Sequence, residues 1–228
     1  MVTVAGDLST FFDGIVPVLQ GGADPSALGG ASELDGLAFY QRMTGVELRR
    51  YLEQACPGLA VALELDERGS FAELAREYFR AHPPAGWDPG AVGAHLCEFL
   101  RGRNAARWSP RYLAEIAEIH SLLRAAALAE DRTVGTLEHA LFVRRYETDS
   151  PRFVRRVLEG AATTLPIDMP TIALVFRSFH TQRAHLMVPS APQLRALLAE
   201  ARGDAGDPGA CAELVDLGVL PCRVARAT

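Results

Sequence analysis

The 228-residue sequence contains no lysine, so all 23 of its basic residues are arginines. This absence excludes sites that depend on a lysine amine, namely the nucleotide-binding P-loop, Schiff-base chemistry and the protein-kinase active site. The net charge of -5 argues against a general nucleic-acid binder, whose surface is basic. A composition of 49% hydrophobic and 22% charged residues is ordinary for a globular protein.

Long apolar runs and paired cysteines are also absent. No window of about 18 apolar residues is present, and Asp7 and Asp13 lie where a signal peptide would be apolar. We therefore expect a cytoplasmic protein that does not insert into a membrane. The four cysteines form no CxxC pair, which argues against a zinc ribbon or a thioredoxin-type site.

The sequence has none of the motifs GxGxxG, HExxH and GxSxG. Glu115 and Glu118 share a predicted helix face near His120, but a di-iron site needs matching ligands from several helices. His180 and His185 flank a predicted turn without a third ligand nearby. We expect no catalytic residue and no metal site in this chain.

The first part of the chain predicts helices. Ser70 and Glu73 form a capping box for a helix that ends before Pro83-Pro84. Ser109-Pro110 begins a longer amphipathic helix that continues to about Leu128. Other helices are predicted over 8–20, 35–56 and 88–102.

The pattern changes after Thr133. LEHALFVRRYE, residues 137–147, alternates enough to permit a strand, and a short helix is predicted from Ser150 to Gly160. IALVFRSFHTQRAHLMV, residues 172–188, has period-two alternation on both sides of a polar turn at 180–183, which predicts a β-hairpin.

Two helices are predicted after the hairpin. Ser190 and Gln193 form a second capping box, and Asp207-Pro208 begins a helix that ends at Gly218. The predicted class is α+β, with an all-α domain over 1–133 and a small winged-helix-like module over 134–228.

Five arginines gather in the segment VRRYETDSPRFVRR: Arg144, Arg145, Arg152, Arg155 and Arg156. Such a patch can bind an acidic peptide, another subunit or a phosphate backbone. It can also be a solvated face whose arginines pair with nearby carboxylates. The sequence leaves both interpretations open.

Four consecutive segments resemble the N-terminal domain of the HvfC/BufC family. These are AFYQRMTGVELRRYLEQACPGLAVAL, FAELAREYFRAHPP, AVGAHLCEFL and SPRYLAEIAEIHSLLRAA, which together cover about residues 35–128. Residues 71–84 are the most specific part. His120 departs from the family pattern, which usually has an acidic residue followed by an aromatic one.

The resemblance implies a partner subunit of a multinuclear non-haem iron-dependent oxidase with a TIM-barrel fold. MbnC-like and TglI-like partners of this kind serve the modification of ribosomally made precursor peptides. The helical domain would dock on the oxidase, which would hold the iron, so no cofactor is expected in this chain. The candidate docking residues are Tyr40, Tyr78, Phe79 and Tyr112.

In such partners the C-terminal part captures the precursor's leader peptide, and the predicted hairpin and two helices of this chain resemble that layout. We expect residues 172–179 to form an exposed strand edge, with the helix 210–217 closing a groove beside it. Arg177 and Arg183 would attract an acidic leader, whereas the apolar candidates could instead be core. The candidate peptide-binding residues are Leu174, Val175, Phe176, Arg177, Phe179, Arg183, Leu214 and Leu217.

Two other functions are considered. A winged-helix transcription regulator would place the helix 210–217 in a DNA groove, but this helix carries Glu213 and Asp216 and no arginine. An enzyme with its own α-helical active site would need a constellation of catalytic residues that the sequence does not show. The predicted function is therefore a non-catalytic, peptide-binding partner subunit.

Overall fold

A computed structural model describes residues 45–67, 69–83, 92–102, 108, 110–129 and 141–221. Contacts divide the chain into two compact units, Met1–Ser109 and Pro110–Thr228. The sequence-based boundary after Thr133 differs from this division, because helix α6 (Arg111–Leu128) contacts all three strands of the second unit. The predicted helix over 8–20 lies outside the described residues.

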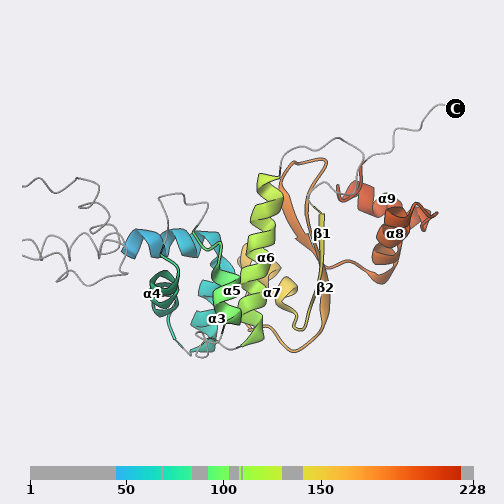
Figure 1. The fold of residues 1–228 in the computed structure, drawn as a ribbon. Coiled ribbons are helices and arrows are strands. Elements are labelled where there is room, and N and C mark those ends of the chain that lie inside the picture. The colour runs from blue at the N-terminus through green and yellow to red at the C-terminus, as the bar shows by residue number, and fades with distance from the viewer. Residues whose placement is uncertain are drawn as a thin grey trace, which may run out of the picture. The chain divides into compact units, whose positions relative to one another are not determined.

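The described part of the first unit is helical (Figure 1). It contains helical residues 45–55, α3 (Pro57–Asp66), α4 (Phe71–Ala81) and α5 (Leu96–Arg101). The predicted capping box of α4 is confirmed, because Glu73 N–H donates to Ser70 Oγ at 3.2 Å and Ser70 N–H donates to Glu73 Oε2 at 2.9 Å. The buried residues Leu52, Leu63 and Leu74 belong to its core.

The second unit is built on a three-stranded antiparallel sheet with the order β1-β2-β3. Its strands are β1 (Leu141–Tyr146), β2 (Thr171–Arg177) and β3 (Ala184–Met187). The predicted hairpin is confirmed as β2 and β3, and the segment that only permitted a strand forms β1. The pairing joins Tyr146 to Thr171 on one side of β2 and Arg177 to Ala184 on the other.

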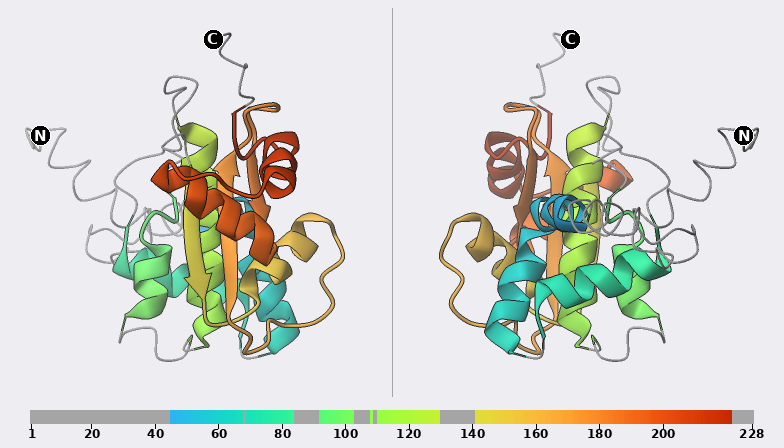
Figure 2. Two further views of the ribbon diagram at one scale, coloured as in Figure 1. Left: turned by 90° about the vertical axis from the view of Figure 1, so that its right-hand side faces the viewer. Right: turned by 90° about the vertical axis from the view of Figure 1, so that its left-hand side faces the viewer.

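Helices cover both faces of this sheet (Figures 1 and 2). α6 and α7 (Ser150–Leu158) contact the sheet on one face, where Val175 and Ala126 are buried together. α8 (Ala191–Arg202) and α9 (Pro208–Asp216) pack on the other face, against Leu174 and Phe176. Because alternate residues of β2 point to opposite faces, this one strand contributes to both cores.

The predicted starts of the last two helices are confirmed. Ser190 and Gln193 form the capping box of α8, and the Asp207 side chain accepts from Gly209 N–H at the start of α9. The α+β class is therefore present as helices with a small antiparallel sheet. Among the described residues, no helix combines the length and the apolar character needed to cross a lipid bilayer.

Candidate functional site

The strand predicted to offer a free edge is the central strand of the sheet. β2 pairs with β1 from Thr171 to Phe176 and with β3 from Leu174 to Arg177, so most of its backbone groups already have partners. The prediction that residues 172–179 form the exposed edge is therefore wrong. It failed because the arginine-rich segment 141–146 pairs with β2.

Half of the predicted peptide-binding residues lie in the core. Phe176 is 3% exposed, and the other three residues of this group are less exposed still. Their side chains fill the space between the sheet and its helices and do not line an open groove. The four buried residues are Leu174, Val175, Phe176 and Leu214.

The other four candidates lie around the hairpin turn and the end of α9. The Arg177 guanidinium donates to the carbonyl oxygens of Ala129 and Gln182, so it fastens the hairpin to the end of α6. Phe179 is half-buried, and its N–H donates to Gly218 O at 3.0 Å. Arg183 and Leu217 are exposed.

The outer edge of β3 follows from the sheet register. In an antiparallel pair, opposite residues alternate between exchanging backbone hydrogen bonds and exchanging none. Ser178 N–H donates to Arg183 O at 2.9 Å, which identifies that pair as hydrogen-bonded. The next pair, Arg177 with Ala184, is then not hydrogen-bonded, and neither is Val175 with Leu186. The N–H and C=O groups of Ala184 and Leu186 therefore point away from β2.

The outer edge of β1 is partly blocked by the chain itself. The same alternation directs the backbone groups of Leu141, Val143 and Arg145 away from β2. The Arg144 guanidinium donates to Val143 O at 3.0 Å and also lies 3.6 Å from a Glu118 carboxylate oxygen. Charged side chains along an edge strand oppose pairing with another chain. Of the two outer edges in the described sheet, that of β3 contains no arginine, whereas that of β1 contains two.

A basic hollow lies where β3 ends. It is lined by Arg152, Arg155 and Arg156 of α7 and by Val188, the residue after β3, and its volume is about 350 Å³. A chain that paired with β3 and continued past Met187 would therefore reach three guanidinium groups. The sequence identified these arginines as a patch, but it gave no indication that they lie beside a strand edge.

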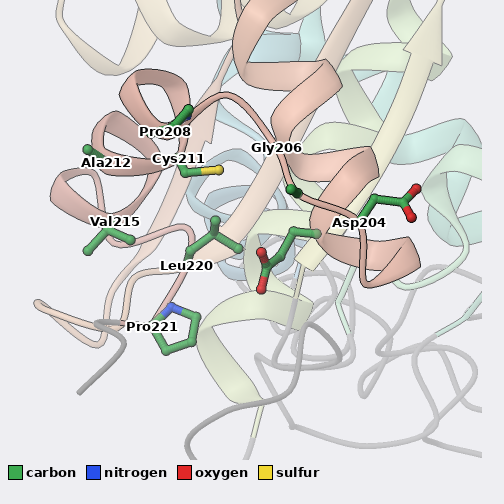
Figure 3. Close-up of a pocket in the computed structure, with 10 residues that line it drawn as sticks. Asp204, Gly206, Pro208, Cys211, Ala212, Val215, Leu220 and Pro221 are labelled. Carbon is green, nitrogen blue, oxygen red and sulfur yellow. The ribbon is translucent and has the colours of Figure 1, made fainter. Parts of the chain in front are cut away.

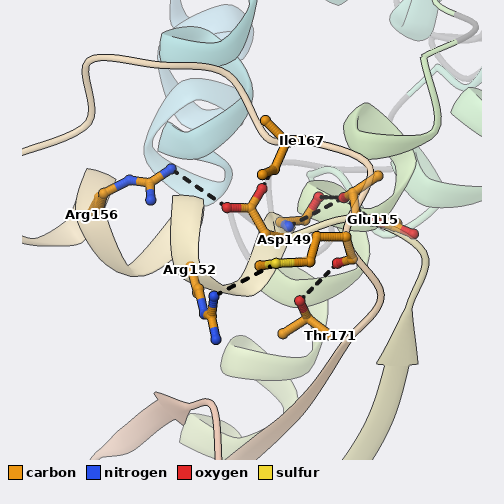
Figure 4. A network of polar contacts seen from close by, with 9 residues as sticks. Glu115, Asp149, Arg152, Arg156, Ile167 and Thr171 are labelled. Atoms are coloured by element: carbon orange, nitrogen blue, oxygen red, sulfur yellow. Dashed lines mark hydrogen bonds and ion pairs between the residues drawn. The ribbon is translucent and has the colours of Figure 1, made fainter.

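Hydrogen bonds hold the start of α7 in place (Figure 4). The buried Glu115 carboxylate of α6 accepts from Glu147 N–H at 2.8 Å and from the Thr148 hydroxyl. Asp149 accepts from Ile167 N–H at 2.7 Å, and its own N–H donates to Ile167 O at 3.0 Å. These contacts tie the turn between β1 and α7 both to α6 and to the segment that leads into β2.

The guanidinium groups of α7 have few close partners among the described residues. Arg155 Nε lies 3.3 Å from Glu159 Oε1, and both side chains are more than half exposed. Arg156 Nη2 lies 4.0 Å from Asp149 Oδ2, and its Nε is buried without a hydrogen-bond acceptor there. Arg152 Nη1 is 4.0 Å from the sulfur of Met169. The hollow therefore retains donors for an anion.

A second hollow of about 430 Å³ lies between α8 and α9 (Figure 3). Val215, Leu220 and Pro221 give it an apolar lining, and Glu200 and Asp204 also contribute to it. Ala184 and Leu186, whose backbone groups point outward from β3, are not among its lining residues.

The candidate docking residues are not gathered on one surface. Tyr78 and Phe79 are 2% and 6% exposed, and the Tyr78 ring packs edge-on against Phe99 at 5.7 Å between centroids. Burial raises the pKa of the Tyr78 hydroxyl above its usual value. Tyr112 is half-buried on α6, and Tyr40 lies outside the described residues. Burial of Tyr78 and Phe79 corrects the expectation that they are docking residues.

A scan of the chain against protein-family models finds no match, and a search of curated proteins finds none either. Within the described ranges, no three histidine, cysteine, aspartate or glutamate side chains come together in a way that could hold a metal ion.

Proposed function

We propose that this chain is a non-catalytic partner subunit that binds a precursor peptide and presents it to an iron-dependent oxidase. The observation that carries the peptide-binding part is the outer edge of β3, where the backbone groups of Ala184 and Leu186 point away from β2. An extended peptide satisfies its own N–H and C=O groups by pairing with such an edge. The peptide would form a fourth strand next to β3.

The oxidase and the post-translational modification come from the resemblance of residues 35–128 to HvfC/BufC-type domains. In this proposal the first unit and α6 supply docking surfaces, and the iron belongs to the partner. The hairpin β2–β3 followed by α8 and α9 supports a winged-helix-like recognition module in the second unit. The absence of arginine from α9 disfavours the alternative, a DNA-binding regulator that reads a groove with this helix.

Strand addition can be tested with the synthetic peptide Glu-Glu-Thr-Val-Thr-Val-Thr-Glu-Glu and the full chain. Leu186→Pro removes a backbone donor that points outward, so the ladder between β2 and β3 keeps its hydrogen bonds. We expect at least about tenfold weaker binding, measured by fluorescence anisotropy. Val143→Pro is the matched control, because it removes an outward donor from β1 and should leave the affinity unchanged.

Leu186 also packs against the α6 side of the sheet, so Ala184→Pro serves as a second variant with less packing to lose. Circular dichroism checks that each variant is folded. If folded Leu186→Pro and Ala184→Pro both bind as the wild type does, strand addition at β3 is wrong. A selective loss in Val143→Pro would instead move the site to β1.

The oxidase is tested separately by affinity capture with the full chain from its native host. Mass spectrometry and metal analysis of the captured material should identify an iron-containing oxidase with a TIM-barrel sequence. Capture of a specific DNA fragment in place of an oxidase would support the regulator and contradict the proposal.

A further inference from the structure

The three arginines of α7 lie on one side of the helix. Arg152, Arg155 and Arg156 occupy positions i, i+3 and i+4, which are neighbours on a helical surface. They line one hollow together with Val188, which follows directly after β3. A strand paired with Ala184 and Leu186 therefore leads into this hollow at one of its ends.

Positive charge exceeds negative charge in this hollow. The Glu159 carboxylate lies 3.3 Å from Arg155 Nε, and the Asp149 carboxylate lies 4.0 Å from Arg156 Nη2. Arg152, in contrast, contacts the uncharged sulfur of Met169. The Asp149 carboxylate also accepts a hydrogen bond from Ile167 N–H, so Arg156 is not its only partner. Each guanidinium has five N–H donors, and these contacts use only a few of them.

Resting on the proposed function, we propose that this hollow is an anion subsite that binds a carboxylate side chain of the peptide paired with β3. A carboxylate matches the planar fork of a guanidinium and can accept two parallel hydrogen bonds from it. A volume of about 350 Å³ admits a side chain without enclosing it. The subsite selects peptides with an acidic residue just beyond the paired segment.

Two synthetic peptides test the subsite: Glu-Glu-Thr-Val-Thr-Val-Thr-Glu-Glu and the same sequence with every Glu replaced by Gln. Acidic residues at both ends reach the hollow whichever way the added strand runs. The wild-type chain should bind the acidic peptide about tenfold more tightly, which corresponds to about 1.4 kcal/mol. This preference should shrink as the salt concentration rises, because salt screens exposed charges.

Three variants of the full chain assign the preference to the hollow. The double variant Arg152→Gln/Arg155→Gln alters only exposed arginines and should remove most of the preference for the acidic peptide. Adding Arg156→Gln should remove the rest of this preference. Arg195→Gln/Arg202→Gln removes the same charge from exposed positions of α8 and is the matched control. The control should keep the full preference for the acidic peptide.

The outcomes separate this inference from the proposed function. If the wild type binds both peptides equally well, the proposal of an anion subsite is wrong, whereas the proposal of strand addition at β3 is retained. An equal loss of preference in the α8 control also overturns the subsite, because the effect would then come from net charge alone. If neither peptide binds, the proposed function fails and the subsite fails with it.

Discussion

Substitution of Glu115 tests directly whether its hydrogen bonds hold α7 in position. The Glu115 carboxylate is buried and accepts from Glu147 N–H and the Thr148 hydroxyl, across the gap between α6 and the turn after β1. Glu115→Ala leaves both donors without this acceptor. An unsatisfied buried donor costs about 1–3 kcal/mol, which applies to the Thr148 hydroxyl; Glu147 is exposed, so its N–H can bond to water instead.

Two effects move the expected value toward the lower part of that range. The Thr148 hydroxyl also shares a hydrogen bond with Ser150 Oγ, so it keeps one partner. Removing the carboxylate also removes the free energy needed to bury its charge. We therefore expect Glu115→Ala to lower the free energy of unfolding by about 1–2 kcal/mol. Glu115→Gln keeps one acceptor oxygen and should lower the free energy of unfolding by less than about 1 kcal/mol.

Urea unfolding followed by circular dichroism measures these differences. The matched control is Glu118→Ala on the same helix, whose carboxylate lies 3.6 Å from the half-exposed Arg144 guanidinium. Such a pair contributes about 0–1 kcal/mol. If Glu115→Ala destabilises the protein no more than Glu118→Ala does, the buried network is not what anchors α7.

Two further predictions concern a glycine and a histidine. Gly218 has φ +71°, and a Cβ there would lie 2.2 Å from Ser178 Oγ, so Gly218→Ala should lower the free energy of unfolding by about 2–5 kcal/mol. Gly203 has a similar φ of +75° but open space around it, so Gly203→Ala should lower the free energy of unfolding by only about 1–2 kcal/mol in the same urea titrations. Equal losses in the two variants would contradict the steric argument. Burial lowers the pKa of His120 from 6.5 to about 4, so the unfolded chain binds this proton more readily than the folded chain does. The free energy of unfolding should therefore rise by about 3 kcal/mol between about pH 4 and 6.5. In His120→Gln this rise should be reduced by that amount, and an unchanged pH dependence would refute the effect of burial.

Local signals in the sequence predicted the elements that depend on neighbouring residues. The capping boxes at Ser70 and Ser190 work through a side chain and a backbone group three residues apart, so the sequence contains the whole interaction. The hairpin β2–β3 is similarly local, because a short turn joins its strands. One local signal was missed: the helix predicted over 35–56 stops before Pro57, but proline also suits the first turn of a helix, and Pro57 begins α3.

The central position of β2 could not be predicted in this way. β1 and β2 are separated along the chain by α7 and its following loop, so their pairing depends on long-range packing. The β1 sequence LFVRRY also lacks a strict alternation of apolar and polar residues, which is the main sequence signal of a half-buried strand. Without β1 in the sheet, the strongly apolar β2 looked like an exposed edge, although its apolar character is what a strand buried on both faces requires.

The distribution of arginines makes the two outer edges of the sheet unequal. In β1, Arg144 covers Val143 O with its own guanidinium, so an incoming chain must displace an intramolecular hydrogen bond before it can pair there. At β3 the three arginines of the hollow lie on α7, and the hollow reaches Val188, just past the end of the strand. In the proposed function, positive charge opposes pairing along the β1 edge and would attract an acidic chain at the end of the β3 edge. If the proposed strand addition is right, this asymmetry would make β3 the preferred side for a fourth strand.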